Sequence, residues 1–339
     1  MKLIWKICLW IIGVIIGLGV VGVVAFQVSP YPNAWVIRQM FNKPVDIQDQ
    51  TKYASAKEQR TFQKDFSYPS AYQNHTFDVY QPKQLEGKVP VLIWAHGGGF
   101  VGGDKSGVKE FATYVAADSK MIVIAMNYQV APDLAYPGQV KQMGELIHYL
   151  QTSQNQAEYA THIDWDKVFV GGDSAGAQIA GQYAVIQTNN DYAKAHQFQQ
   201  TLTKTQLRGF ISYSGPVHLK QVKDKPATSR AMKWFVNSVG WSLVGTKQWQ
   251  TTPELQAASL VDHLTNDFPP TYITDGNAFS FADEGIALQK RLNELHVPVT
   301  GLFYEETKKE ITHEYQFNYK TKEAQQAYQE TTAFIAQQR

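Results

Sequence analysis

A serine stands at the centre of a glycine-flanked pentapeptide, GDSAG at residues 172–176. An apolar run, KVFVG at 167–171, precedes it, and a stretch with helical periodicity follows it over 175–187. A G-x-S-x-G sequence between a strand and a helix makes a sharp turn that exposes the serine hydroxyl, with the helix N-terminus behind it. This context predicts Ser174 as a nucleophile; the alternative is a tight turn with a capping serine.

A second glycine motif, HGGGF at residues 96–100, lies upstream of the serine and directly after another apolar run. Consecutive glycines let backbone N–H groups point at one spot, where they stabilise the negative charge that develops on a carbonyl oxygen under attack, by about 2.7–4 kcal/mol for each donor. We assign this oxyanion hole to the backbone of Gly98, Gly99 and Ala175. The alternative is a flexible glycine turn. His96 is expected to shape the loop rather than to act as the base.

Three motifs in this order resemble those of a known family. HGGGF is followed by MNYQVAP at 126–132, in the place of a D-Y-R-x-A-P block, and then by GDSAG. The chain resembles the hormone-sensitive-lipase-like carboxylesterases of the α/β-hydrolase superfamily over roughly residues 75–335. The resemblance implies a triad of serine, carboxylate and histidine without a cofactor. It also implies hydrolysis of carboxylic esters, usually with short acyl chains, under a helical cap.

The general base is expected downstream of Ser174, because the triad of α/β-hydrolases follows the order Ser, acid, His. His313 lies in a loop after the last expected strand and can reach back over the sheet edge. His296 precedes that strand and lies at its wrong end. An exposed loop histidine is the alternative for His313. The other downstream histidines are His196, His218 and His263.

The acid departs from the family pattern. After the apolar run at 271–274 the family reads G-x-x-D-x-x-x-D-E-G, and Phe279 stands at the position of the first aspartate. A triad needs a carboxylate to orient the imidazole and to stabilise its charged form. We expect Asp283, one helical turn later, with Asp275 as the alternative and Glu284 behind both. In the competing interpretation Asp283 only favours its helix N-terminus and Asp275 only shapes a turn.

Short apolar runs alternate with helical stretches along the chain. Runs rich in β-branched and aromatic residues suit strands that are buried on both faces, and their alternation with helices predicts a mostly parallel sheet covered on both sides. The family resemblance implies that this sheet is that of an α/β-hydrolase fold. TFDVY at 76–80 alternates in polarity, as an antiparallel edge strand does. The expected buried strands are 89–95, 121–128, 167–171, 207–214, 271–274 and 297–304, and the helices are 139–151, 175–187, 283–295 and 322–337.

The N-terminus predicts a membrane anchor. Residues 7–26 carry no charge, and thirteen of these twenty residues are Ile, Leu, Val or Phe. A helix of this length spans about 30 Å, the thickness of the hydrocarbon layer. Lys2 and Lys6 precede the run, so the positive-inside rule puts the N-terminus in the cytoplasm and the rest outside a cell membrane, as a single-pass protein. A cleaved signal segment, and therefore a secreted protein, is the alternative.

These features divide the chain into three parts. Residues 1–29 form the anchor or signal segment, 30–70 a polar connector with one helix, and 71–339 a catalytic α/β-hydrolase domain. Within it, 217–264 breaks the strand-helix rhythm and holds several tryptophans, which predicts a helical cap.

Composition excludes several partners. The net charge is +1, and no basic stripe, zinc-type cysteine spacing or phosphate-binding loop occurs, so nucleic acid, structural zinc and nucleotides are not expected. Cys8 is the single cysteine, which rules out an intrachain disulfide. Glu305, Glu306 and Glu314 surround His313 without a second histidine, so we predict no metal there.

The sequence thus predicts hydrolysis of a small-molecule ester by Ser174, His313 and a carboxylate, without cofactor or metal. The sequence gives no oligomeric state. Two alternatives stay open. The same machinery would serve a deacetylase, amidase or peptidase acting on the cell envelope. The missing acid at Phe279 would suit a non-catalytic, membrane-tethered binding protein, because fold does not fix function.

Overall fold

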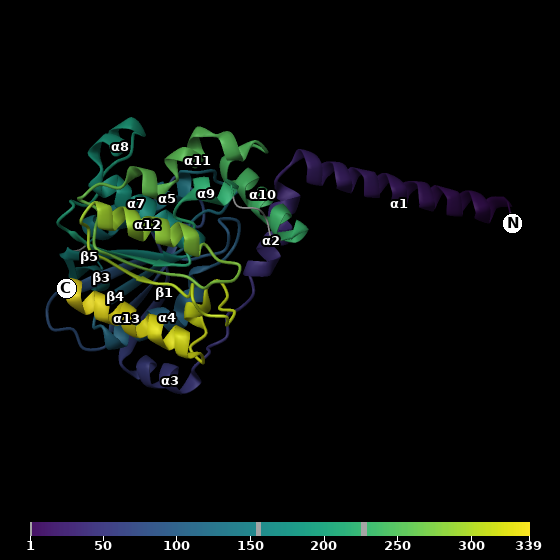
Figure 1. The fold of residues 1–339 in the computed structure, drawn as a ribbon. Coiled ribbons are helices and arrows are strands. Elements are labelled where there is room, and N and C mark those ends of the chain that lie inside the picture. The colour runs from purple at the N-terminus through teal and green to yellow at the C-terminus, as the bar shows by residue number, and fades with distance from the viewer. Residues whose placement is uncertain (1, 154–156, 225–228) are drawn as a thin grey trace.

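The computed structural model describes residues 2–153, 157–224 and 229–339. Residues 225–228, inside the expected cap, lie outside this part. In the described part an eight-stranded sheet runs through the centre in the order β1-β2-β4-β3-β5-β6-β7-β8 (Figure 1). β2 pairs antiparallel with both β1 and β4, and all other neighbours are parallel. The strands are β1 (Arg60–Ser67), β2 (Thr76–Pro82), β3 (Val89–Ala95), β4 (Ile122–Met126), β5 (Ile163–Asp173), β6 (Leu207–Tyr213), β7 (Thr271–Thr274) and β8 (Val299–Leu302).

Helices cover both faces of this sheet (Figure 1). One apolar layer packs α5 (Gly138–Thr152), α7 (Ala175–Thr188) and α12 (Ala282–Glu294) on the sheet. The opposite layer packs α3 (Gln50–Glu58), α4 (Lys109–Asp118) and α13 (Lys322–Gln338). Because both faces are buried, β3 and β4 are apolar along almost their whole length, as the sequence predicts for parallel strands. The α/β-hydrolase fold is therefore confirmed.

The edge of the sheet differs from the prediction. β2 was expected to be the antiparallel edge strand, but β1 pairs on its outer side, with a register shift between Gln63 and Phe66. β1 alternates poorly in polarity and lies in the range expected to be a connector, which is why the sequence did not indicate it. Its side chains are half-buried or exposed along most of the strand, as an edge strand allows.

The expected cap range is helical. It contains α9 (Leu219–Asp224), α10 (Arg230–Val244) and α11 (Pro253–Ala257), with a 3-10 turn at Trp249–Thr251 between α10 and α11. The range expected as a connector adds α2 (Tyr31–Phe41), which packs against α10 through a small apolar cluster around Ile37 and Val101. The cap thus has a second component that comes from the N-terminal end of the chain. The remaining helices are α6 (Glu158–Thr161) and α8 (Asn190–Ala195).

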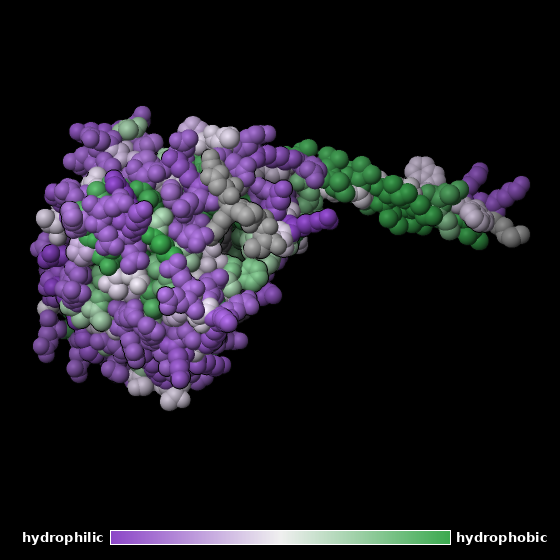
Figure 2. Space-filling model, in the orientation of Figure 1, coloured by the Kyte–Doolittle hydropathy of each residue, from purple (hydrophilic) through white to green (hydrophobic). Residues whose placement is uncertain are grey.

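The helix α1 (Lys2–Val28) projects away from this body (Figure 1). None of its apolar window is buried against the rest of the chain, and its length and composition suit a membrane span or a signal sequence. Figure 2 shows it as a continuous hydrophobic rod that ends in hydrophilic residues near the N-terminus. Such a surface is stable only inside an apolar environment.

Candidate active site

Ser174 occupies a strained turn at the carboxyl end of β5. Its backbone has φ +48° and ψ −118°, and α7 begins at the next residue. A non-glycine residue adopts this conformation only where its surroundings enforce it, and the sharp strand-to-helix turn of hydrolases is such a place. A Cβ at Gly176 would collide with the carbonyl of Ala95, so glycine lets α7 approach the end of β3. The pentapeptide is therefore explained by the turn it forms.

His313 faces this serine. Its Nε2 lies 3.0 Å from Oγ of Ser174, a hydrogen-bond distance. The histidine lies in the loop between β8 and α13, as the sequence predicts, and its ring meets the ring of Phe281 edge-on at 5.3 Å. A base that receives a hydrogen bond from the serine can take its proton as the oxygen attacks.

The carboxylate beside this imidazole belongs to Asp275. Its Oδ2 lies 3.6 Å from Nδ1 of His313, which is an ion-pair distance but longer than a hydrogen bond. Both carboxylate oxygens also accept backbone N–H groups at 2.7 Å, Oδ1 from Gly276 and Oδ2 from Phe281. Asp275 directly follows β7 and is buried, so it is held firmly against the histidine loop.

The preference for Asp283 is therefore not supported by this geometry. Asp283 lies in the first turn of α12 with an exposed side chain, where a carboxylate favours the helix dipole. The carboxyl ends of parallel strands meet at one edge of the sheet, and Asp275 already stands at such an end. The family pattern had favoured Asp283, which lies further along the chain. Glu284 is buried in the same helical turn.

Backbone hydrogen bonds join the loop of Asp275 to the loop of His313. The N–H groups of Asn277 and Ala278 donate to the carbonyl of Ile311, and the N–H of His313 donates to the carbonyl of Ala278 at 3.0 Å. Phe279, which stands where the family has aspartate, adopts φ +52° and is 63% exposed. The two loops therefore keep their relative position without a carboxylate at Phe279.

The glycine motif forms a tight loop after β3. Gly98 has φ +117° and Gly99 has φ +60°. In the described chain, the N–H groups of these two glycines have no hydrogen-bond acceptor, and Ala175 is the first residue of α7, where N–H groups lack a partner inside the helix. His96 is buried, stacks on Tyr128 at 4.4 Å, and accepts the Tyr128 hydroxyl at its carbonyl, so it shapes the loop as expected.

A pair of carboxyl groups, Asp173 and Glu314, flanks Ser174 and His313 in the chain. Asp173 accepts the indole N–H of Trp94 at Oδ1 and the N–H of Gly97 at Oδ2, both at 2.7 Å. Glu314, the residue after His313, brings its carboxyl to the same place beside Gly97. Burial and the nearby Glu314 raise the pKa of Asp173 to about 8, although Trp94 and Gly97 oppose the shift. Burial also raises the pKa of Glu314. The pair therefore retains a proton near neutral pH.

The nearby carboxyl groups of Asp275, Glu314 and Asp173 affect the pKa of the His313 imidazole. Burial alone would lower its pKa, but the nearby carboxylate of Asp275, together with the charges of Glu314 and Asp173, outweighs burial and raises the pKa above the ordinary 6.5. A charged imidazole is thus stabilised, which is what a base needs once it has taken a proton. The sequence did not indicate Asp173 or Glu314, because each is only a neighbour of a recognised residue.

Two helices form a roof over the glycine loop. A Cβ built at Gly99 would lie 3.4 Å from the Phe235 ring and 3.5 Å from a Val239 methyl, both on α10, and 3.6 Å from the Phe41 ring on α2. The rings of Phe41 and Phe235 are 6.2 Å apart. These apolar side chains lie next to the expected oxyanion hole. The sequence predicts a helical cap but does not indicate the contribution of α2.

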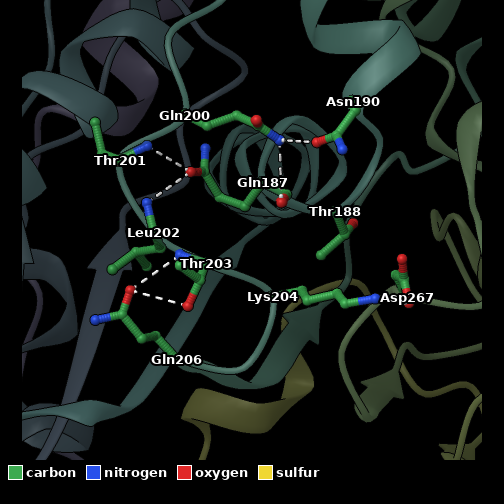
Figure 3. Close-up of a pocket in the computed structure, with 10 residues that line it drawn as sticks. All are labelled: Gln187, Thr188, Asn190, Gln200, Thr201, Leu202, Thr203, Lys204, Gln206 and Asp267. Atoms are coloured by element: carbon green, nitrogen blue, oxygen red, sulfur yellow. Dashed lines mark hydrogen bonds and ion pairs between the residues drawn. The ribbon is translucent and has the colours of Figure 1, made fainter.

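A separate polar hollow lies at the other end of α7, where none of the predicted site residues occurs. Its volume is about 460 Å³ (Figure 3). Gln187 accepts the N–H groups of Thr201 and Leu202, and Lys204 pairs with Asp267 at 2.7 Å. Because the polar groups of this hollow bond one another, it offers no reactive constellation.

Comparison with known proteins agrees with the fold. A family model described as alpha/beta hydrolase fold matches residues 92–313, and a carboxylesterase family model matches residues 13–132. The "Probable carboxylesterase 6" of Arabidopsis thaliana is 34% identical over 104 residues, 30% of this chain and 31% of that protein. An esterase of Fusarium pseudograminearum is 24% identical over 225 residues, 64% of each chain. The matches thus span about one third to two thirds of these relatives.

Solved structures share the whole architecture. The esterase B of Lactobacillus rhamnosis (HN001) has a TM-score of 0.68 and 20% sequence identity, over 94% of this chain and 96% of that chain. At this sequence identity the structural similarity supports the fold alone. The family model, by contrast, covers most of the chain and includes Ser174, Asp275 and His313. On this match, and on the fold described above, the chain belongs to the α/β-hydrolase family.

Proposed function

We propose that this protein is a membrane-anchored serine esterase that cleaves carboxylic esters with short acyl chains through an acyl-enzyme. The observation that carries the proposal is the 3.0 Å contact between Nε2 of His313 and Oγ of Ser174, with Asp275 behind the ring. The resemblance of the chain to proteins named carboxylesterase or esterase supports the substrate class.

The first half of the reaction transfers the acyl group to the enzyme. Ser174 Oγ attacks the ester carbonyl carbon while Nε2 of His313 takes the hydroxyl proton. The carbonyl oxygen becomes an oxyanion that accepts the N–H groups of Gly98, Gly99 and Ala175. The tetrahedral intermediate then collapses, and the bond to the alcohol oxygen breaks as His313 returns the proton to that oxygen.

The second half uses water. His313 takes a proton from a water molecule as its oxygen attacks the acyl-enzyme, and the same N–H groups stabilise the second oxyanion. The bond to Oγ then breaks, Oγ regains the proton from His313, and the carboxylic acid leaves. Asp275 remains ionised throughout and holds the imidazole in orientation.

The contact of Asp275 with His313 favours a catalytic role over the non-catalytic alternative, because the absence of an aspartate at Phe279 was the reason for that alternative. A deacetylase, amidase or peptidase would use the same residues. Only substrate profiling can therefore distinguish these activities from esterase activity.

The test uses the full chain in detergent micelles. We expect hydrolysis of p-nitrophenyl acetate and butyrate, weaker hydrolysis of the octanoate, and labelling by a fluorophosphonate probe. Ser174→Ala should lose labelling and several powers of ten in kcat, while Ser55→Ala, at an exposed position on α3, should keep both. Equal labelling of all three proteins would refute the assignment of Ser174, and the thermal melting curve of each variant shows whether it is folded.

The anchor is proposed from α1, whose 27 residues are long and apolar enough to span a bilayer. By the positive-inside rule, Lys2 and Lys6 favour an N-terminus in the cytoplasm and a hydrolase body outside. Intact mass measured on membrane-extracted protein tests this. A mass that includes residues 2–28, in a fraction resistant to alkaline extraction, supports an anchor, whereas a shorter protein in the medium means a cleaved signal segment.

A further inference from the structure

One exposed face of the protein lies where α1 leaves the body, on the outer sides of α2 and α10 (Figure 1). Aromatic and apolar side chains that are usually buried are open there, with Trp35 63% exposed. We call this surface the α2–α10 face. It comprises Tyr31, Trp35, Met40, Lys43, Lys233 and Trp234.

This face has a fixed position next to the helix α1. α1 ends at Val28 and α2 begins at Tyr31. The Asn33 side chain joins the two parts of the face, because its Nδ2 donates to the carbonyl of Phe26 at 3.0 Å and its Oδ1 accepts the indole N–H of Trp234 at 2.8 Å. Asn33 itself is buried. The face therefore meets whatever surface α1 enters.

The two segments that build the α2–α10 face carry basic residues and no acidic ones. Residues 29–45 and 229–247, the two segments that build it, contain five Lys or Arg and no Asp or Glu, in a chain whose net charge is only +1. Arg38 pairs with Asp133 at 3.3 Å. Among the residues that the structure describes, Lys43 and Lys233 have no acidic partner.

Tryptophan and tyrosine beside lysine and arginine are the residues that membrane proteins place at the headgroup level. Basic residues near the surface of an anionic leaflet contribute about 1 kcal/mol each. The geometry points to a lipid bilayer as the partner: the α2–α10 face docks on the headgroup layer of the membrane that α1 spans. This inference rests on the proposed anchor.

Docking on this side has a consequence for the substrate. The inner sides of the same two helices carry Phe41, Phe235 and Val239, which lie over Gly99 at the expected oxyanion hole. The roof of the site is thus the layer of protein nearest the lipid. An ester with an apolar acyl group and a polar head concentrates at that surface, so the substrate class that the site meets there is amphiphilic esters in the membrane interface.

The test uses the full chain in nanodiscs of phosphatidylcholine and phosphatidylglycerol. In a Cys8→Ser background, a fluorophore is attached to Trp35→Cys or, as the matched control, to Ser55→Cys on α3, which packs on the opposite face of the sheet. We expect lipids with a spin label near the headgroup to quench the fluorophore at 35, and aqueous iodide to quench it several-fold less than at 55. p-Nitrophenyl butyrate hydrolysis should be equal in both proteins.

Equal iodide quenching at 35 and 55 would overturn the docking. Protection from iodide without quenching by lipid would also overturn it and would indicate a contact with another protein copy. In the same Cys8→Ser background, a fluorophore at Ile15→Cys, an exposed position in the middle of α1, separates this failure from that of the anchor. If that fluorophore is quenched by deep-labelled lipid while position 35 is not, the anchor stands and the docking alone is wrong. If position 15 is open to iodide, both are wrong.

Discussion

The carboxyl group of Asp173 accepts the backbone N–H of Gly97 at 2.7 Å, so the residue before Ser174 holds the start of the glycine loop. The other oxygen accepts the indole N–H of Trp94, which is buried in the sheet. Asp173 therefore fixes β3, the loop after it and the nucleophile turn relative to one another. Because the burial of Asp173 raises its pKa, it should make the free energy of unfolding depend on pH.

The free energy of unfolding should fall as pH rises from about 4 to 8. Asp173 has an ordinary pKa of 3.8 and a folded pKa of about 8, raised by burial and by Glu314. Between these values the folded state holds a proton that the unfolded state has released, so stability decreases with pH. The raised pKa of His313 acts in the same direction, because its contribution is lost as pH rises through the folded value.

Denaturant unfolding followed by tryptophan fluorescence, at several pH values in this window, measures the decrease. Asp173→Asn cannot ionise and should flatten it, at a cost of about 1–3 kcal/mol where the amide faces the N–H of Gly97. Asp166→Asn, at a position away from the site in β5, serves as the control. A slope that is unchanged in Asp173→Asn would assign the pH dependence to another group.

Asp275→Asn should lower kcat by roughly 10⁴, as loss of the orienting carboxylate does in a comparable triad. The amide can no longer favour the correct tautomer and the charged form of His313. Asp283→Asn should change kcat by less than about threefold, because its carboxylate is exposed in the first turn of α12. Steady-state kinetics with p-nitrophenyl butyrate measures both. The reverse pattern would restore Asp283 as the acid.

The acid illustrates where the sequence stops being sufficient. Ser174 and His313 could be predicted because each has a local signature or a unique position after a strand. Asp275 had only its place at a strand end, and its position beside His313 depends on hydrogen bonds from Gly276 and Phe281 that no spacing reveals. The family pattern favoured positions further downstream.

In the N-terminal region, too, the sequence was not sufficient to predict the fold. The central strands β3 and β4 are continuous apolar runs, and the other parallel strands contain short ones, so they could be predicted within a few residues. β1 and α2 have mixed polarity, because each is exposed on one side, so the sequence predicted one helix in this range without its position and did not indicate β1. Only tertiary packing brings Phe41 of α2 over Gly99. The connector therefore became part of the active-site roof only once the structure was known.

The acid limb of kcat/KM should lie above pH 6.5, because ester cleavage needs neutral His313 and the surrounding carboxylates raise its pKa. Glu314→Gln removes one of these charges, so the limb should move to lower pH. Glu306→Gln, at an exposed position in the loop before His313, should leave it unchanged. Rates measured from about pH 5 to 9 with one ester give the three profiles. A limb that moves to higher pH in Glu314→Gln would contradict the electrostatic argument, whereas a loss of rate at every pH would mean that Glu314 acts on structure alone.

Gly98→Ala should abolish most of the esterase activity. Gly98 has φ +117°, and a Cβ there would collide with the backbone of Gly102, so the loop must open and its N–H groups must leave their positions. Loss of one oxyanion donor costs about 10²–10³ in kcat, and displacement of the loop should cost at least as much. Gly87→Ala is the matched control, because Gly87 also has positive φ, at +79°, but has open space around it. It should lose about 1–2 kcal/mol of stability from the backbone strain alone and keep its kcat. If kinetics show that both variants lose kcat equally, backbone strain and not the position of the N–H groups explains the effect, and the oxyanion hole must be sought elsewhere.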